Sequence, residues 1–369
     1  MSDSYGVDVD ACRGRQQRML ELMEQNALDL VVVTQNEHIQ WLTGARFPWL
    51  FQSIATLSAD GYVDLIAPQR APAVAAADNI VSYEAKWHST MRNDQRLACC
   101  QTLQETWRTR PLPRRLGVEY SSYGRHFGFW DSAELVDVEP NLYQFRRRKD
   151  ADEMSLLRKA ISGTEKMYQL ARQIIEPGIA ELEVFNQLQA VAVHEFGEML
   201  TGTGNDYQCG SRGGPPRNQR TAAAGELYIL DLGPAFRGYF ADNARTIAVT
   251  QADDTQQEAW SFIMQAFQHV ESNVRPGKSC RELFNEVQAI LDRAPCGVFN
   301  HHLGHGIGLF PHEGPHLNPN WDDSFEEGDV FTAEPGLYAP ELRFGMRVEN
   351  DYRVTADGAE LLTEFGLEL

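Results

Sequence analysis

Apolar residues in the first 146 positions follow helical and strand-like spacing in turn. Helical spacing runs from Arg13 to about Ala27, and the run LDLVVV that follows is typical of a buried strand. Further β-rich stretches flank Asp60-Gly61, a favourable hairpin turn, and LGVEY at 116–120 predicts another strand. Strands that alternate with helices predict an α/β domain over residues 1–146.

A strongly charged segment, RRRKDADEM at 146–154, interrupts this pattern. It leads into a long helical pattern that runs to Ile175 and that Pro177-Gly178 ends. We interpret the charges as a solvated linker followed by an acid-rich helix start, in preference to a phosphate-binding patch. A domain boundary is therefore expected here, with a second domain over residues 147–369.

An internal repeat indicates how the second domain is organised. PGIAELEVFN at 177–186 and PGKSCRELFN at 276–285 share Pro, Gly, Glu, Phe and Asn in register. A match this short can also arise by chance. As a true repeat, it predicts two half-domains that open with helices and continue into antiparallel strands. The result is a pseudo-two-fold α+β domain with a cleft between its halves.

Length and charge narrow the classes of function. A chain of 369 residues is long for a single core, which agrees with two domains. Its 33 basic and 52 acidic residues give a formal net charge of -19, which repels nucleic acid and anionic membranes. Without an apolar N-terminal segment or a membrane-length apolar run, the protein is expected to be cytoplasmic. Six scattered cysteines, none in a CxxC pair, are interpreted as reduced thiols.

Two acidic pairs are placed symmetrically about turns. ELYILDLGPAFRGYFADNARTIAV reads as strand, Gly/Pro turn and strand, and a simple hairpin makes Asp231 and Asp242 direct cross-strand partners. TAEPGLYAPELRFGMRVENDYRV places Glu334 and Glu349 in the same way, although Pro335 interrupts a regular ladder. Opposed carboxylates in a sheet are destabilising unless a cation bridges them, so both pairs predict a metal ion.

Between the hairpins lies FNHHLGHGIGLFPHEGP, which holds four of the ten histidines. Here His301, His305 and His312 sit among glycines that let imidazoles crowd a small space, which favours a link to metal. Four carboxylates and one imidazole form a hard, oxygen-rich shell for two divalent ions, which favours Mn²⁺ and permits Co²⁺, Fe²⁺ or Zn²⁺. Two such ions would share a deprotonated water and use it as the nucleophile.

Six short motifs resemble those of the pita-bread metallopeptidases and occur along the chain in the order DLG, ADNART, HHLGHGIGL, HEGP, AEPG and RVEN. That family contains aminopeptidase P, prolidase, methionine aminopeptidase and the related creatinase. The resemblance covers nearly the whole chain, because LDLVVVT, WLTGA and ADGYVDLIAP match a creatinase-type N-terminal domain. It implies a two-metal site whose ligands are Asp231, Asp242, His305, Glu334 and Glu349.

Individual roles also follow from the resemblance. Asp231 would chelate one metal, His305 and Glu334 would hold the other, and the remaining two carboxylates would bridge both. Glu334 would also act as general base toward the bridging water. The histidines at 301 and 312 match outer histidines of the family, which position the substrate and stabilise the tetrahedral intermediate. Arg347 is expected to hold the carboxylates together.

One position departs from the family. Members usually carry a further histidine upstream of the first metal aspartate, where it meets the substrate, and here that position falls at or near Gly214. The segment CGSRGGPPRNQR offers no histidine. The role must be filled otherwise, or the substrate is not a standard Xaa-Pro peptide. In this segment Arg212 and Arg217 either face an anionic substrate or are ordinary surface arginines.

Three functions are therefore compared. The first is a dinuclear metallopeptidase, an Xaa-Pro aminopeptidase or dipeptidase acting on small peptides. The second is a non-peptidase hydrolase of small C–N compounds, similar to creatinase or ectoine hydrolase, which the missing histidine favours. The third is a non-enzymatic interaction module, which the retained ligand positions disfavour. The resemblance also implies a homodimer.

Overall fold

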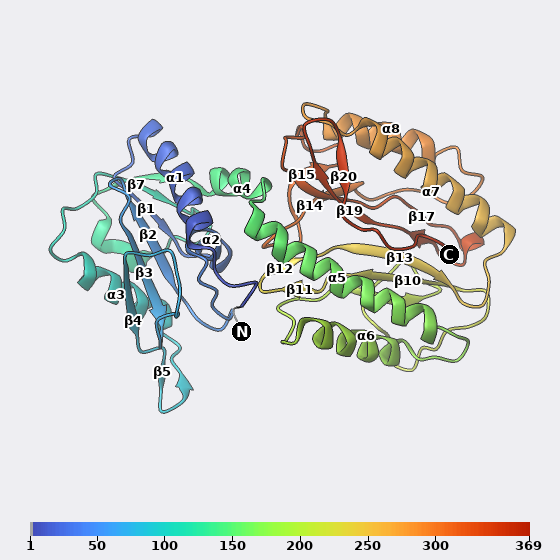
Figure 1. Cartoon of the computed structure of the whole chain (residues 1–369), viewed down its shortest axis with the longest axis horizontal. Coiled ribbons are helices and arrows are strands. Elements are labelled where there is room, and N and C mark those ends of the chain that lie inside the picture. The colour runs from blue at the N-terminus through green and yellow to red at the C-terminus, as the bar shows by residue number, and fades with distance from the viewer. Residues whose placement is uncertain (1–2) are drawn as a thin grey trace. The chain divides into compact units, whose positions relative to one another are not determined.

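The computed structural model describes residues 3–369, and its backbone contacts divide the chain into two compact units, residues 1–146 and 147–369 (Figure 1). In the described part of the chain, no helix is long and apolar enough to cross a membrane. The six cysteines are free thiols, in agreement with their interpretation as reduced.

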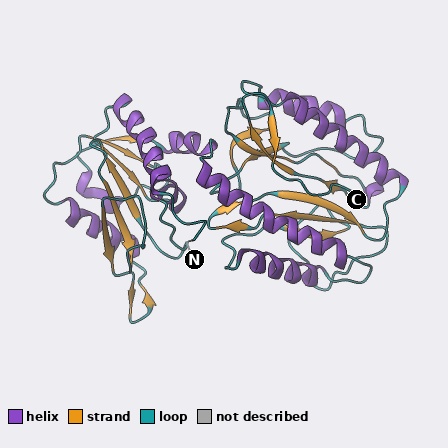
Figure 2. Cartoon of the chain, in the orientation of Figure 1, coloured by secondary structure: helices purple, strands orange, loops and turns teal. Residues whose placement is uncertain are grey.

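The first unit is built on a six-stranded mixed sheet in the order β4-β3-β2-β1-β7-β8, with helices packed on it (Figure 2). Its central strand β1 pairs antiparallel with β2 and parallel with β7, and all four of its apolar residues are buried. The predicted Asp60-Gly61 turn joins β2 to β3. The elements are α1 (Val9–Gln25), β1 (Leu30–Val33), α2 (Asn36–Thr43), β2 (Ile54–Ser58), β3 (Val63–Pro68), β4 (Asn79–Tyr83), β5 (Lys86–Trp87), β6 (Thr90–Met91), α3 (Gln95–Trp107), β7 (Arg115–Val118), β8 (Glu134–Asp137) and α4 (Glu139–Arg147).

The second unit contains two helix pairs, each packed on its own sheet. Helices α5 and α6 share a core with the sheet β13-β10-β9, and α7 and α8 share one with β15-β14-β16-β19-β20 (Figure 1). The elements are α5 (Ala151–Ile174), α6 (Glu181–Phe196), β9 (Asp206–Cys209), β10 (Leu227–Leu232), β11 (Ala235–Phe236), β12 (Tyr239–Phe240), β13 (Asn243–Ala248), α7 (Asp254–Asn273), α8 (Cys280–Leu291), β14 (Gly304–Gly306), β15 (Glu313–Leu317), β16 (Val330–Ala333), β17 (Gly336–Leu337), β18 (Met346–Arg347), β19 (Asn350–Val354) and β20 (Ala359–Leu361).

The sequence repeat marks equivalent points of the two halves. Two residues separate each of its Pro-Gly pairs from the start of α6 or α8, and Gly178 and Gly277 adopt similar positive φ angles of 97° and 85°. A glycine adopts this conformation without the steric cost that a side chain would add. The predicted pseudo-two-fold α+β architecture is confirmed.

The charged segment before α5 is not the solvated linker that we expected. The Arg147 guanidinium lies 2.6 Å from Asp329 and the Lys149 ammonium 3.1 Å from Glu313, and all four side chains are buried. Both partners lie far along the chain, so the pairing is invisible to local sequence patterns. The expected helix start is correct, because Asp150 forms a capping box at the first turn of α5.

Candidate metal centre

The first acidic hairpin differs from the simple one that we predicted. Strands β10 and β13 pair antiparallel, but Asp231 lies opposite Ala244, and Asp242 falls just before β13. The connection continues the pairing in the same register, with Ala235 opposite Phe240. The prediction of direct cross-strand pairing was wrong because it centred the hairpin one residue too early: both ladders turn about Arg237-Gly238, so Asp231 faces Ala244 and not Asp242.

The second acidic hairpin has the predicted register. Gly336 pairs with Arg347 on one side and Ala333 pairs with Asn350 on the other, so Glu334 and Glu349 occupy matching positions in the gap between two ladders. The backbone N–H of Glu349 donates to the carbonyl oxygen of Ala244, 2.9 Å away. This bond joins the second hairpin to β13, which brings the two acidic hairpins together.

The structure gathers all five predicted ligands in two overlapping groups. Possible ligand atoms lie within 4.8 Å of one another in the group of Asp231, Glu334 and Glu349 and in the group of Asp242, His305 and Glu349. The His305 Nε2 atom is 3.7 Å from Asp242 Oδ2 and 3.8 Å from Glu334 Oε1. Glu349 belongs to both groups and therefore lies between two positions at which a cation can bind.

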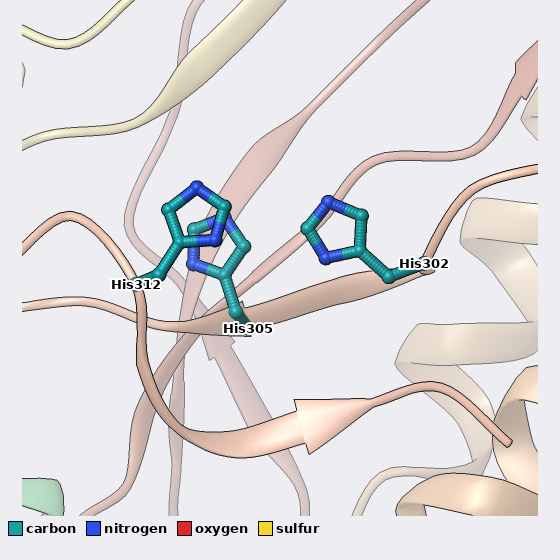
Figure 3. A group of neighbouring side chains, drawn as sticks. All are labelled: His302, His305 and His312. Atoms are coloured by element: carbon teal, nitrogen blue, oxygen red, sulfur yellow. The ribbon is translucent and has the colours of Figure 1, made fainter. Parts of the chain in front are cut away.

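The outer histidines lie beside these groups. The His312 ring stacks on the His305 ring with centroids 3.9 Å apart (Figure 3). The His301 Nε2 atom is 2.9 Å from the Tyr338 hydroxyl, and its Nδ1 is 2.8 Å from the carbonyl oxygen of His302. Hydrogen bonds on both nitrogens fix the orientation of the His301 ring.

Arg347 contacts the carboxylates that it was expected to organise. Its Nη2 atom donates to Asp231 Oδ2 at 2.7 Å and also to Asp206, while Nη1 is 3.3 Å from the Tyr338 hydroxyl. Asp206 lies opposite Asp231 in the pairing of β9 with β10. A guanidinium between two carboxylates offsets part of their mutual repulsion.

Three residues of the centre were missed from the sequence. Asp206 is brought in by the pairing of β9 with β10, and no sequence signal marked that contact. Tyr338 lies within the second acidic hairpin, and its hydroxyl contacts His301 and Arg347. His302 stands in the histidine motif itself, and its Nε2 atom is 3.1 Å from Glu334 Oε1. The doubled histidine was the signal that could have pointed to it.

Burial shifts the ionisation of the centre toward neutral side chains. Burial raises the pKa of Glu334 to about 8, and it raises the pKa values of Asp242 and Glu349 well above their usual range. Burial also lowers the pKa of His301 to about 3 and that of His302 to about 4, so both imidazoles are neutral at neutral pH. A divalent cation binds carboxylates and neutral imidazoles, so it would restore charge to the acids.

The donor set fits divalent metal ions. Glu349 is 1% exposed, and neither of its carboxylate oxygens has a hydrogen-bond partner among the described residues. Buried carboxylate oxygens are rarely left without a partner unless an ion or water completes the site. Oxygen donors with one or more imidazoles suit divalent ions from Mn²⁺ to Zn²⁺.

Comparison with known families agrees with this geometry. The model of metallopeptidase family M24 matches residues 155–356, more than half of the chain, and the Creatinase/Prolidase N-terminal domain matches residues 15–147. The chain belongs to metallopeptidase family M24. The predicted pita-bread family with a creatinase-like N-terminal domain is confirmed, and so is the prediction of an enzyme. Membership in this family implies divalent metal ions.

Similar proteins cover the M24 chain to different extents. YkvY of Bacillus subtilis (strain 168) is 32% identical over 241 residues, which are 64% of this chain and 66% of that protein. The Xaa-Pro dipeptidase of Pyrococcus horikoshii is 26% identical over 373 residues, covering 98% of this chain and 100% of the relative. The solved structure of an Xaa-Pro dipeptidase from Bacillus anthracis superposes with a TM-score of 0.82 at 22% identity, covering 97% and 99% of the two chains.

In the loop of this M24 chain that lacks a histidine, the two arginines have different surroundings. Arg217 donates to Glu181 at 2.6 Å and to the Cys209 carbonyl, so it is part of the protein framework and does not face a substrate. Arg212 lies with its Cζ 4.2 Å from the ring centroid of Tyr338 and donates to Asn300. Among the described residues, Arg212 forms no ion pair with a carboxylate. Its positive charge is therefore available beside the centre.

Proposed function

We propose that this M24 metallopeptidase is a dinuclear hydrolase that releases the N-terminal residue from short peptides with proline in the second position. The observation that carries the proposal is the pair of ligand groups that share Glu349. Similarity to an Xaa-Pro dipeptidase over the full chain supports the substrate class. Its homodimeric state and cytoplasmic location stay predictions.

Each metal position would draw on both acidic hairpins. Asp231 would hold one ion, His305 and Glu334 the other, and Asp242 and Glu349 would contact both. When bound, two divalent ions supply an activated water as nucleophile and polarise the scissile carbonyl.

Side chains of the protein would carry out the proton transfers and position the substrate. In its ionised form, Glu334 would accept a proton from the attacking water and return it to the leaving nitrogen. The His301 ring, fixed by Tyr338, would position the substrate, and the His312 ring would donate a hydrogen bond to the carbonyl oxygen as charge develops there. Arg347 would keep Asp231 in place.

A second candidate is hydrolysis of a small non-peptide C–N bond, as in a cyclic amidine or a guanidino acid. The observation that favours it is Gly214, which has a φ of 125° and whose added Cβ would lie 2.9 Å from the Gln208 amide. A histidine here would have a strained backbone, and this chain presents no imidazole at this position to meet a peptide. Arg212 is compatible with both candidates, because a dipeptide and a guanidino acid each carry a carboxylate.

The deciding experiment compares substrates on metal-restored protein. Metal-free protein is supplied separately with Mn²⁺, Co²⁺ or Zn²⁺ and assayed on Xaa-Pro dipeptides, Xaa-Pro tripeptides and small amidines, with Asp242→Ala as control. Metal-dependent release of the N-terminal residue, lost in the control, supports the peptidase. Binding of two metals with cleavage of amidines alone supports the second candidate, and absence of metal binding contradicts both.

A further inference from the structure

His302 lies inside the centre, although the proposed ligand set does not use it. Its Nε2 atom is 3.1 Å from Glu334 Oε1, closer than the 3.8 Å approaches of His301 and His305 to the same carboxylate. His302 lies in the loop immediately before β14. Of the imidazoles in the centre, His302 is therefore the nearest to Glu334.

The histidines differ in how their ring nitrogens are engaged. Both nitrogens of His301 have hydrogen-bond partners, and Nδ1 of His305 lies 3.0 Å from the Gly306 carbonyl, which leaves only Nε2 of that ring for a metal. This arrangement is common for metal-binding histidines. Within residues 3–369, no hydrogen bond involves Nδ1 of His302 or either ring nitrogen of His312, and Nε2 of His302 contacts the Glu334 carboxylate, itself a proposed ligand. These two rings are therefore available as ligands.

The three available rings converge. Ligand atoms of His302, His305 and His312 lie within 4.8 Å of one another, and those of His301, His302 and Glu334 form a second such group. The His302 ring centroid is 5.3 Å from that of His305 and 5.6 Å from that of His312 (Figure 3). Two nitrogens bound to one ion at about 2.1 Å each lie no more than about 4.2 Å apart. Small side-chain rotations bring these rings within that limit.

We propose that His302 is a further ligand at the metal position of His305 and Glu334, with His312 within reach, and that this position selects Zn²⁺ or Co²⁺ over Mn²⁺. Imidazole suits Zn²⁺ and its neighbours, whereas carboxylate and water suit Mn²⁺, so each added nitrogen shifts the preference away from Mn²⁺. The inference rests on the proposed function, because it concerns the same centre. It replaces the preference for Mn²⁺ that an oxygen-rich shell with one imidazole suggests.

Metal affinities of the metal-free protein test this ligand. Dissociation constants for Zn²⁺, Co²⁺ and Mn²⁺ are measured by competition with a chromophoric chelator for wild type, His302→Ala and His302→Asn. The exposed imidazole of His194 supplies a matched control, His194→Ala. We expect both His302 variants to bind Zn²⁺ and Co²⁺ at least about tenfold more weakly, with a change of less than about threefold for Mn²⁺ and none in the control.

The outcomes separate this inference from the proposed function. Equal losses for all three ions would overturn it, since His302 would then only position Glu334, and unchanged affinities would also overturn it. Failure of wild type to bind any of the ions would instead contradict the proposed function. X-ray absorption of wild type loaded with one equivalent of Zn²⁺ needs no variant to fold. About two imidazoles per zinc are expected, and a single imidazole would refute the added ligand.

Discussion

Individual carboxylates of the centre are buried and lack the partners that would stabilise their negative charge. Glu349 has two buried carboxylate oxygens without hydrogen-bond partners, and burial, with Asp242 as the next cause, raises its pKa well above the usual range. Without metal, such groups are neutralised by protons or remain mutually repulsive. The metal-free state is therefore destabilised by the same side chains that bind the ions.

Asp242→Asn tests this conflict. The change keeps the shape of the side chain and removes one charge from the buried group, so we expect metal-free Asp242→Asn to melt above metal-free wild type, by about 2–4 °C for each kcal/mol gained. Added Mn²⁺ or Zn²⁺ should raise the melting temperature of wild type and not that of the variant. Glu327→Gln, which removes an exposed charge, serves as control. A variant less stable than wild type without metal would contradict the argument.

Arg212 allows a test of substrate charge. We expect Arg212→Gln to raise KM about tenfold for a dipeptide with a free carboxylate, because a hydrogen bond to a charged group contributes about 1.5 kcal/mol or more. The amide of the same dipeptide should show no such change. Initial rates over a range of substrate concentrations measure the effect, and Arg275→Gln at an exposed site is the control. Equal effects on acid and amide would show that Arg212 does not recognise a carboxylate.

At the level of helices and strands, counting residues outward from a hairpin turn predicts cross-strand partners only where the turn is centred on the correct residues. Glu334 and Glu349 could be placed together because both ladders of their hairpin have the register that symmetry about Glu341-Leu342 gives. The count failed for Asp231 and Asp242, because their hairpin turns at Arg237-Gly238, one residue later than the count assumed. Asp206 and the ion pairs of the segment before α5 depend on partners distant in sequence, which no local pattern reveals. Helix α5 and the repeat, by contrast, are determined by local spacing and caps.

The close approach of β14 and β15 depends on Gly306. A Cβ atom there would overlap the carbonyl of Gly314, so Gly306→Ala must displace the strand that carries His305. We expect a loss of about 1–3 kcal/mol in unfolding free energy, together with weaker metal binding. Urea unfolding and metal titration measure both. Gly358→Ala, where the nearest atom lies 3.8 Å from the added Cβ, should change neither.

Asp29 ties the start of β1 to that of β7. Its carboxylate accepts hydrogen bonds from the backbone N–H groups of Arg114 and Arg115 at 2.7 and 3.0 Å. These bonds, of which the one from Arg115 has the larger effect, hold the pKa of Asp29 below its usual value of 3.8. The stabilisation is present above the unfolded pKa and is lost as pH falls through the folded one. The difference in unfolding free energy between wild type and Asp29→Asn should thus be constant from about pH 7 to 5 and shrink below about pH 4. A difference that grows with acid would reverse this sign.

For the molecule as a whole, the division into two units separates the chemistry from the rest of the chain. Every ligand group of the candidate centre lies within residues 147–369, where the two acidic hairpins and the histidine segment meet. The first unit has its own sheet and core. A metal that binds the folded centre therefore stabilises only the second unit directly.

Calorimetry can resolve this effect, because a ligand at 100 times its dissociation constant adds about 2.7 kcal/mol to the state that binds it. For a unit of this size that corresponds to a rise of about 5–10 °C in melting temperature. We expect metal to shift the transition of residues 147–369 and to leave that of residues 1–146 in place, with neither shift in Asp242→Ala. Fragments released by proteolysis between the two melting temperatures assign the transitions. Equal shifts of both would mean that the units unfold as one cooperative block, and a shift in the first unit alone would place the metal elsewhere.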